Sequence, residues 1–427
     1  MDSRKGELIV KYVLMHKEIP VLTLDIDDVV CVVRKTEEVF NAAHLPVGIH
    51  IRHGVVDRAE FNEWWVDRSI PASRSGVKTA LEALNLSNTR LLLTKCLGLS
   101  LSDQYWIRPI NREDLRWKDI NFFDNPFSED IGDVLLGKAV KKDAFDFHSP
   151  DNTSDGCLKK RWKIVGGKRC LIKAGSAPLM LQPFNEVIAT AIMKKLNISH
   201  IPYRVLWDDG VPYSVCEDFI TRDTELVSAW RVMQTTKRDN STSVYRHCIN
   251  CCEALGITGI THAIDQMIVL DYIIANEDRH LNNFGLIRNA ETLEWVGVAP
   301  IFDSGSSLGY DKLPVQILSG KDIDCKPFKK RHEEQLKLVT DCSWIDFTAL
   351  ENIDEDIREI FAGAGMYADE KRVNAIISSV KHRISNLQAL ASQKNAIIDN
   401  IEEDVLENVA EDYTEKRVEK FLREQDI

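Results

Sequence analysis

The sequence predicts an α+β protein made of two or three packed units, and three observations support this prediction. A chain of 427 residues is too long for a single hydrophobic core, so several units with their own interiors are expected. The first half of the chain contains β-rich runs and hairpin signals beside segments of helical spacing. Beyond about residue 225 the spacing of the apolar residues is mostly helical.

Composition narrows the class of protein. The start of the chain, MDSRKGELIV, has no apolar signal-peptide core, and aspartates interrupt the apolar stretches well before a membrane-spanning length. The ten cysteines are scattered without a framework pattern, which favours reduced thiols. A formal charge of -12 gives no overall basic field. We therefore expect a cytoplasmic protein with no membrane segment and no direct contact with nucleic acid.

Residues 1–145 are expected to form an amino-terminal unit of strands followed by helices. LIVKYVLM and IPVLTLDI are β-rich runs that are typical of neighbouring strands, and DRAEFNEWWVDRS and RSGVKTALEAL then show helical spacing. The two tryptophans of the first helix and the segment SLSDQYWIRP could form a recognition surface, but aromatic residues more commonly build core. After Asn125 the composition shifts to Asp, Asn, Ser, Pro and Gly, which places a boundary there.

Residues 146–222 show the order hairpin, helix, hairpin. In LKKRWKIVGGKRCLIKAGS two short β-rich runs flank the pair Gly166-Gly167, which is a good hairpin signal. Residues 182–196 have the spacing of an amphipathic helix, and PYRVLWDDGVPYSVCEDF then reads as a second hairpin. These elements form the second predicted unit.

Residues 223–427 form the third predicted unit, which is mostly helical and ends in a charged amphipathic helix. Only NFGLIRNAETLEWVGVAPIFD interrupts the helical spacing, as a short pair of β-like runs. HCINCC has a C-x-x-C spacing that could bind zinc, but no second ligand pair lies at a suitable spacing. Cysteines three and four residues apart share one face of a helix, so core thiols are favoured.

The segment NEDRHLNNFG, Asn276 to Gly285, concentrates polar side chains directly after an apolar run. Asp278 and Asn283 have the separation of the aspartate and asparagine in a kinase catalytic loop, where the first acts as base and the second binds metal. Asp303, in APIFDSGSS, follows a β-like run and stands two residues before a glycine, as the metal-binding aspartate of a D-x-G segment does.

Two upstream residues complete this pattern. Phosphoryl transfer from a nucleotide needs a lysine on a strand to hold the phosphates. Lys173 ends the second strand of the first predicted hairpin, and Glu186 lies on the following helix, where its carboxylate could pair with Lys173. Taken singly, each is more often an exposed charge, and a D-R-H triplet is often a solvated helix end, so the prediction depends on the whole set.

Together, NEDRHLNNFG and APIFDSG resemble the HipA-like serine/threonine kinases and, less closely, the phosphatidylinositol kinases, which share a D-R-H-x-x-N signature. The resemblance covers roughly residues 150 to 310. It implies a bilobal protein-kinase-like fold. Residues 1–145 would be a β-containing amino-terminal module, 146–222 the nucleotide-binding lobe, and 223–427 a mostly helical lobe with the catalytic loop and the metal-binding segment.

The resemblance also implies binding residues upstream of the catalytic loop. CEDF is similar to the family's hinge, in which a glutamate and the phenylalanine two residues on, here Glu217 and Phe219, meet the adenine through their backbones; Ile220 then stands where a polar residue near the ribose is expected. The family has a short phosphate loop just before the hairpin of Lys173, with a serine that can be phosphorylated. This chain has TSDGCLKK there, with a single glycine. The implied loop residues are Thr153, Ser154, Asp155 and Gly156.

The sequence therefore predicts an ATP- and Mg²⁺-dependent protein serine/threonine kinase of HipA type. Lys173 would hold the phosphates, Asp278 would orient the acceptor hydroxyl, and Asn283 and Asp303 would bind Mg²⁺. A protein substrate and, in a toxin–antitoxin setting, an antitoxin are the implied partners, and Thr153 and Ser154 either accept a phosphate or cap a turn.

Two alternatives stay open. One is a small-molecule or phosphatidylinositol-type lipid kinase, which a basic patch beside Asp278 would favour; none is evident in the sequence. The other is a pseudokinase that acts as a binding module, although a scaffold would not need the complete set of catalytic residues.

Overall fold

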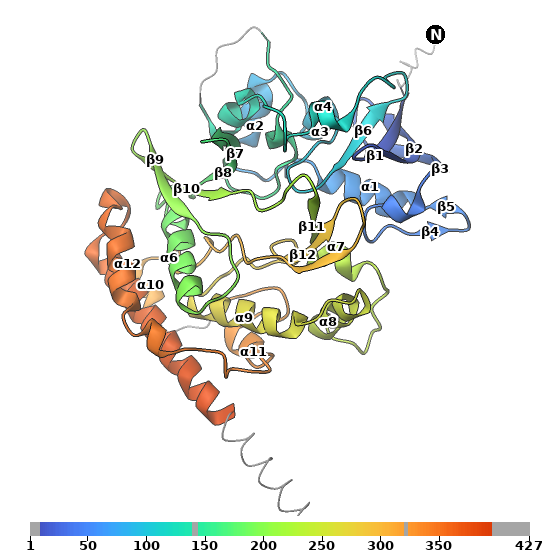
Figure 1. Cartoon of the computed structure of the whole chain (residues 1–427). Helices are drawn as coiled ribbons and strands as arrows, with labels where there is room; N and C mark the ends of the chain where they lie inside the picture. Colours follow the sequence, from blue (N-terminus) through green and yellow to red (C-terminus); the bar gives the residue numbers. More distant parts are fainter. Residues whose placement is uncertain (1–8, 139–143, 320–322, 395–427) are drawn as a thin grey trace, which may run out of the picture.

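The computed structural model of the chain describes residues 9–138, 144–319 and 323–394. Within these residues the strands form four antiparallel sheets, with helices packed around them (Figure 1). The charged helix predicted for the end of the chain falls partly beyond residue 394, outside the described residues. None of the helices described is both long and apolar enough to cross a membrane.

The first sheet comes from the amino-terminal part of the chain and has the order β3-β2-β1-β6. Its strands are β1 (Ile9–His16), β2 (Ile19–Asp27), β3 (Val33–Val39) and β6 (Tyr105–Pro109). The two runs predicted as neighbouring strands are β1 and β2, and they pair along their whole length. β6 is not predicted as a strand; it returns beside β1 after three helices and buries Tyr105, Trp106 and Ile107.

A two-stranded ribbon and short helices also belong to the amino-terminal part of the chain. They are the ribbon β4 (Ile51–Arg52) and β5 (Val55–Val56), and the helices α1 (Arg58–Asp67), α2 (Val77–Ala83), α3 (Arg90–Lys95), α4 (Trp117–Ile120) and α5 (Asp130–Leu136). α1 begins where the Asp57 carboxylate accepts hydrogen bonds from two backbone N–H groups of the first turn. It buries Trp64 and Trp65 against the sheet, which confirms them as core residues.

The second sheet has the order β7-β8-β10-β9 and forms the predicted pair of hairpins. Its elements are β7 (Lys160–Val165), β8 (Lys168–Ala174), β9 (Arg204–Asp208) and β10 (Val211–Glu217), with α6 (Gln182–Lys195) between the hairpins. Gly166 and Gly167 have φ of 58° and 81°, a region that L-residues with side chains avoid, so the turn needs them.

The third sheet has the order β11-β12-β13, and helices follow it to the end of the described chain. Its strands are β11 (Thr224–Ser228), β12 (Gly285–Asn289) and β13 (Trp295–Val298). The sequence predicts β12 and β13 but not β11. The helices of this part are α7 (Ala229–Met233), α8 (Val244–Ala254), α9 (Ile260–Ile273), α10 (Pro314–Ile317), α11 (His332–Leu336), α12 (Ile353–Ala362) and residues 370–394.

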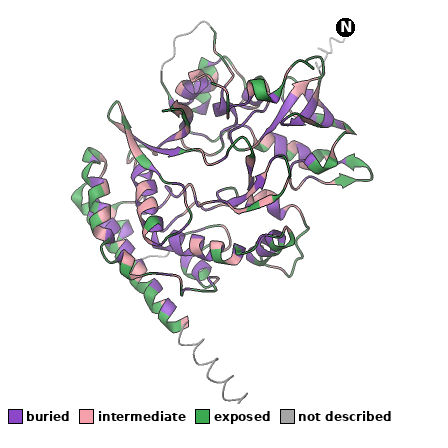
Figure 2. Cartoon of the chain, viewed as in Figure 1, coloured by how far each residue is buried: buried purple, intermediate pink, exposed green. Residues whose placement is uncertain are grey.

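The largest hydrophobic core lies between α6, α8, α9 and the later helices, which appear in Figure 2 with their buried faces turned toward one another. From Met267 to Ile273 every residue of α9 is buried, so the second half of this helix passes through the core. The cysteines of HCINCC lie on α8, and Cys248, Cys251 and Cys252 are all buried in the core, as predicted.

The amino-terminal part is attached to the segment that follows the second sheet. The Gln104 side chain donates hydrogen bonds to the backbone carbonyls of Thr221 and Thr224, at 2.8 and 2.7 Å. Nearby, the buried His16 ring lies 3.1 Å from the Glu225 carboxylate. These buried polar contacts tie the first sheet to β11, beside the cavity described next.

Candidate functional site

A cavity of about 510 Å³ lies where the second sheet faces the loop before β12 and the loop after β13. Ser100, Leu101 and Ser102 of the amino-terminal part also line it. Every residue predicted for the site lines this cavity except Glu186, which lies behind Lys173. These lining residues are Thr153, Ser154, Asp155, Gly156, Lys173, Glu217, Phe219, Asp278, Asn283 and Asp303.

Lys173 is the centre of a buried charge cluster. β8 carries its side chain into the cavity, where the ammonium lies 2.7 Å from Glu186 Oε1 and 2.6 Å from Asp303 Oδ1. The contact between Lys173 and Glu186 that the sequence suggests is therefore present. Lys173 also lies over the Tyr203 ring, 5.1 Å from its centroid, so the lysine is held from three sides.

Burial and neighbouring charges act against each other in this cluster. Burial opposes the charge on Lys173, but the carboxylates of Asp303 and Glu186 raise its pKa well above its ordinary value. Burial would raise the pKa of Asp303, yet the lysines beside it hold that pKa below its usual range. Burial raises the pKa of Glu186 in spite of Lys173. The ammonium of Lys173 and the carboxylate of Asp303 are thus both charged near neutral pH.

The segment that carries Asp303 is pressed against α6. The Ser304 N–H donates to Glu186 Oε2 at 2.9 Å, so both oxygens of Glu186 are used. A Cβ at Gly305 would come within 3.0 Å of the Gln182 carbonyl, which explains the glycine of the D-x-G pattern. Asp303 itself has a φ of 56°, a backbone conformation that is rare for residues other than glycine and concentrates at functional sites.

Arg279 joins the predicted catalytic loop to the Asp303 segment. Its guanidinium is fully buried and pairs with both carboxylate oxygens of Asp271, at 3.0 and 3.1 Å. It also donates to the carbonyls of Asn283 and Phe302 and, at 2.8 Å, to the Ser304 hydroxyl. The arginine of the D-R-H triplet therefore positions both loops and does not face the cavity.

Asp278 and Asn283 are held by hydrogen bonds within their own loop. The Asp278 N–H donates to the Asn276 side-chain oxygen at 3.0 Å, and the Asn283 amide nitrogen donates to the Asp278 carbonyl at 2.9 Å. The His280 N–H also donates to the Asp278 carbonyl, at 2.8 Å. The tight turn leaves the Asp278 carboxylate half-exposed at the edge of the cavity, where a ligand can reach it.

One basic side chain that the sequence does not reveal lies beside Asp278. The Lys326 ammonium is 2.8 Å from Asp278 Oδ1. Lys326 belongs to the segment CKPFKKR, 48 residues further along the chain, and no local pattern connects it with the catalytic loop. The fold thus places one lysine beside Asp278, which the sequence does not reveal.

The predicted phosphate loop is clamped by the amino-terminal part. Arg74, which is 2% exposed, donates to the Ser154 hydroxyl at 2.9 Å and to the Gly156 carbonyl at 2.9 Å, and it also bonds the Ser154 carbonyl. Thr153 is buried, and its hydroxyl donates to the Leu99 carbonyl at 2.9 Å. In this conformation both hydroxyls are turn and packing groups.

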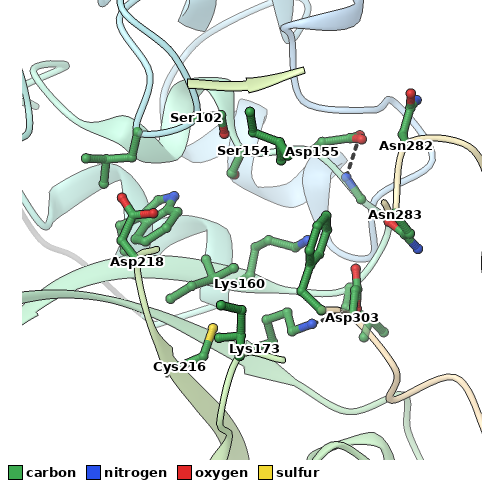
Figure 3. A pocket seen from close by; sticks show the side chains of 18 of the residues that line it. Ser102, Ser154, Asp155, Lys160, Lys173, Cys216, Asp218, Asn282, Asn283 and Asp303 are labelled. Carbon is green, nitrogen blue, oxygen red and sulfur yellow. Dashed lines mark hydrogen bonds and ion pairs between the residues drawn. The ribbon is translucent and has the colours of Figure 1, made fainter. Parts of the chain in front are cut away.

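Lys160 is a site residue that the sequence interpretation missed. It is 6% exposed, lines the cavity, and its ammonium makes no hydrogen bond or ion pair with any described residue. Burial lowers its pKa to about 8. Figure 3 shows Lys160 and Lys173 pointing to the same part of the cavity, near Asp303. The hairpin signal could have found it, because a turn at Gly166-Gly167 pairs residue 160 with residue 173 and places both on one face.

The residues predicted for the hinge also line the cavity. The Glu217 carboxylate points to solvent and pairs with Lys168 at 2.8 Å, so only its backbone belongs to the cavity wall. Phe219 packs near Phe302, with ring centroids 5.5 Å apart. Between them, burial raises the pKa of Asp218 to about 8.

The donor set near Asp303 fits a magnesium ion that is shared with a nucleotide. Asn283 uses its amide nitrogen within the loop, which leaves the amide oxygen for a ligand, and Asp303 Oδ2 makes no hydrogen bond or ion pair with a described residue. No group of three or more His, Cys, Asp or Glu side chains suited to a metal occurs in the described parts of the chain. Mg²⁺ is commonly held by one or two protein oxygens together with phosphates and water, so two ligands suffice.

Comparison with known proteins identifies the family. The model of the HipA-like C-terminal domain matches residues 142–387, which is more than half of the chain. The chain belongs to this family. All residues predicted for the site lie inside the matched range of the HipA-like domain. No curated protein matches the chain.

Two solved structures are similar to this HipA-like chain at low identity. The Helicobacter pylori proinflammatory kinase CtkA is 18% identical, with a TM-score of 0.44, and the match covers 56% of this chain and 94% of CtkA. A chain of the Shewanella oneidensis MR-1 toxin–antitoxin complex of HipA, HipB and operator DNA is 13% identical, with a TM-score of 0.49. That match covers 90% of this chain and 99% of the other.

Proposed function

We propose that the protein is an ATP- and Mg²⁺-dependent protein serine/threonine kinase of HipA type. The observation that carries the proposal is the convergence of Lys173, Asp278, Asn283 and Asp303 on one cavity, although they lie up to 130 residues apart in the chain. Phosphoryl transfer needs charge placement and little covalent chemistry, and these groups supply that placement.

The proposed arrangement is bilobal and kinase-like. The second sheet with α6 forms the smaller lobe, the helical part forms the larger lobe, and the nucleotide lies between them. Glu217 and Phe219 meet the adenine through their backbones, and the loop Thr153 to Gly156 approaches the phosphates, with Asp155 at its rim. Lys160 and Lys173 offer two ammonium groups to the phosphates, which are the strong charge-assisted contacts expected of a triphosphate site.

The roles of the remaining residues follow from their positions. Asn283 and Asp303 hold Mg²⁺, which neutralises charge on the transferred phosphoryl group. Asp278 orients the acceptor hydroxyl and receives its proton. The Lys326 ammonium contacts Asp278 Oδ1. It must move away from this oxygen before the acceptor hydroxyl can bind there.

A lipid kinase is the second candidate, because the basic side chain that would favour it is present beside Asp278. Transfer of labelled phosphate to phosphatidylinositol vesicles, compared with transfer to proteins of the host extract, separates the two kinases. The pseudokinase alternative predicts no transfer to either. The toxin–antitoxin setting rests on the family resemblance, and a DNA-binding protein encoded by the neighbouring gene would support it.

Calorimetry with ATP, with and without Mg²⁺, tests the proposal directly. Binding that is tighter with Mg²⁺ is expected, because Asn283 and Asp303 hold the metal and the metal holds the phosphates. Circular dichroism of the same sample shows whether the protein is folded. Folded protein that binds no ATP under either condition would rule out both kinase functions.

A further inference from the structure

Two further cavities continue from the nucleotide cavity along the outer side of the catalytic loop. The first, of about 340 Å³, shares His280 and Asn282 with the nucleotide cavity. The second, of about 660 Å³, shares Trp230 and Leu281 with the first and reaches Arg52 on the β4–β5 ribbon. The two together, from His280 to Arg52, are called the side groove below.

The floor of the side groove is apolar and fixed. Trp230, Leu281 and Pro327 line its first part. The backbone N–H of Trp230 donates to the Leu281 carbonyl at 3.0 Å, which ties the two segments together. A fixed apolar floor beside a reactive carboxylate can hold a ligand without a large cost in ordering the protein.

The rim of the groove carries unpaired positive charge. Lys237 and Arg238 are exposed and line the second cavity, and neither forms an ion pair with a described residue. Arg238 donates only to the Thr242 carbonyl, at 2.7 Å. Arg52, in contrast, is already paired with Glu60 at 2.7 Å. The chain as a whole has a formal charge of -12, so this positively charged edge differs in sign from the net charge of the protein.

Lys326 provides a further positive charge at the end of the groove near Asp278, and hydrogen bonds fix the turn that carries it. Gln335, which is 1% exposed, donates from its side chain to the Lys326 carbonyl at 2.8 Å and accepts from the Phe328 N–H at 3.0 Å. Phe328 in turn packs near Phe284 of the catalytic loop, at 6.2 Å between ring centroids. The buried Gln335 side chain therefore fixes the backbone at Lys326, while the Lys326 ammonium stays half-exposed.

We propose that the side groove binds the acceptor segment of a protein substrate as an extended chain and favours acidic residues near the acceptor hydroxyl. This inference rests on the proposed kinase function and names its substrate class. A carboxylate of the substrate pairs with Lys326, which frees Asp278 for the acceptor hydroxyl. The Lys326 and Asp278 side chains are 53% and 46% exposed, and an exposed pair of this kind is exchanged at little cost.

The shape of the groove favours a polypeptide over a lipid headgroup. A headgroup is compact and would fill only the end at Lys326. The groove continues past Trp230 to Lys237 and Arg238, so several residues of an extended chain can lie in it, at about 3.4 Å per residue. The carboxylates of that chain then meet cations at both ends of the groove.

Two fluorescein-labelled peptides of equal length test the inference by fluorescence anisotropy. Each has a central serine, flanked in one by Asp and Glu and in the other by Asn and Gln. They are titrated with protein saturated with a non-hydrolysable ATP analogue and Mg²⁺. The groove variant is Lys237→Glu/Arg238→Glu. The matched control is Arg116→Glu/Lys118→Glu, which reverses one exposed arginine and one exposed lysine on the amino-terminal part.

The acidic peptide is expected to bind the wild type and the control equally, and the groove variant about tenfold more weakly, as two lost exposed ion pairs allow. The neutral peptide should bind all three proteins alike. Equal affinities of the two peptides for the wild type, or the same loss in the control, would overturn the inference. The inference would also be overturned if short RNA or phosphatidylinositol vesicles bound the wild type more tightly than the acidic peptide does and lost this binding in the groove variant.

The affinity of the ATP analogue, measured separately, keeps the two proposals apart. Intact analogue binding without a preference for the acidic peptide refutes the acceptor groove and leaves the kinase proposal standing. Failure of the folded protein to bind the analogue refutes the kinase proposal, whatever the peptides do.

Discussion

Arg279 and Asp271 form a two-pronged ion pair that is fully buried, with nitrogen–oxygen distances of 3.0 and 3.1 Å. The pair lies directly beneath the candidate site and connects α9 with both loops that carry the proposed catalytic groups. Because Arg279 also donates to carbonyls of these loops, its charge is compensated by several partners at once.

Breaking this pair should destabilise the protein strongly. Arg279→Met leaves the Asp271 carboxylate buried without its cation, which typically costs about 3–5 kcal/mol of unfolding free energy. Asp271→Asn keeps an acceptor oxygen and should cost less. Urea unfolding followed by circular dichroism measures both. Arg112→Met, which removes an exposed pair with Asp114, serves as control and should leave the unfolding midpoint unchanged. A wild-type midpoint for Arg279→Met would refute the positioning role.

Asp278→Asn should separate nucleotide binding from chemistry. The side chain lies at the edge of the cavity and does not contact Lys173 or Asp303, so ATP affinity should stay close to that of the wild type. Turnover should fall by roughly 10²- to 10⁴-fold, the usual contribution of a general base. Lys173→Met should instead weaken ATP binding. Equal losses of affinity and turnover in Asp278→Asn, measured by calorimetry and by release of labelled phosphate, would count against this assignment.

Much of the candidate site could be predicted from local patterns in the sequence. The glycine pair defines the hairpin that places Lys173, and the hydrogen bonds that position Asp278 and Asn283 relative to each other are local. In such segments the geometry is set by residues a few positions apart. The same locality explains why the helix and hairpin boundaries between residues 160 and 217 agree closely with those predicted.

Contacts between distant segments could not be predicted in this way. Arg74 and Ser154 are 80 residues apart, and Lys326 and Asp278 are 48 apart, with no periodic signal that links them. The strand β6 pairs with β1 although α1, α2 and α3 lie between the two strands in the chain. Only the fold therefore shows that the amino-terminal part lines the cavity and holds the predicted phosphate loop in place.

Nucleotide affinity should decrease as the pH rises through about 8, the value to which burial lowers the pKa of Lys160. Below that pH the ammonium is charged and attracts the phosphates; above it the neutral amine loses this attraction. The phosphates themselves titrate near pH 6, below this window. Calorimetry across roughly pH 7 to 9.5 should show the decrease in the wild type. The Lys160→Met variant should bind more weakly at pH 7 and show a flatter profile. An identical pH profile in both proteins would refute the role of Lys160.

The final prediction concerns a phosphate added to the loop between Asp151 and Lys160. The hydroxyl of Ser154 lies in the clamp of Arg74, and that of Thr153 donates to the Leu99 carbonyl, so neither can receive a phosphate until the loop leaves its place. A phosphate there adds about two negative charges beside the site for the nucleotide phosphates, and ATP affinity should fall. Arg74→Ala removes the clamp, and the loop should then be modified faster. Mass spectrometry after incubation with ATP and Mg²⁺ measures the modification, with Asp278→Asn as the inactive control. If wild type and Arg74→Ala both gain no phosphate in this segment while they phosphorylate another substrate, self-inhibition through the loop is wrong, and Thr153 and Ser154 serve only to hold the turn.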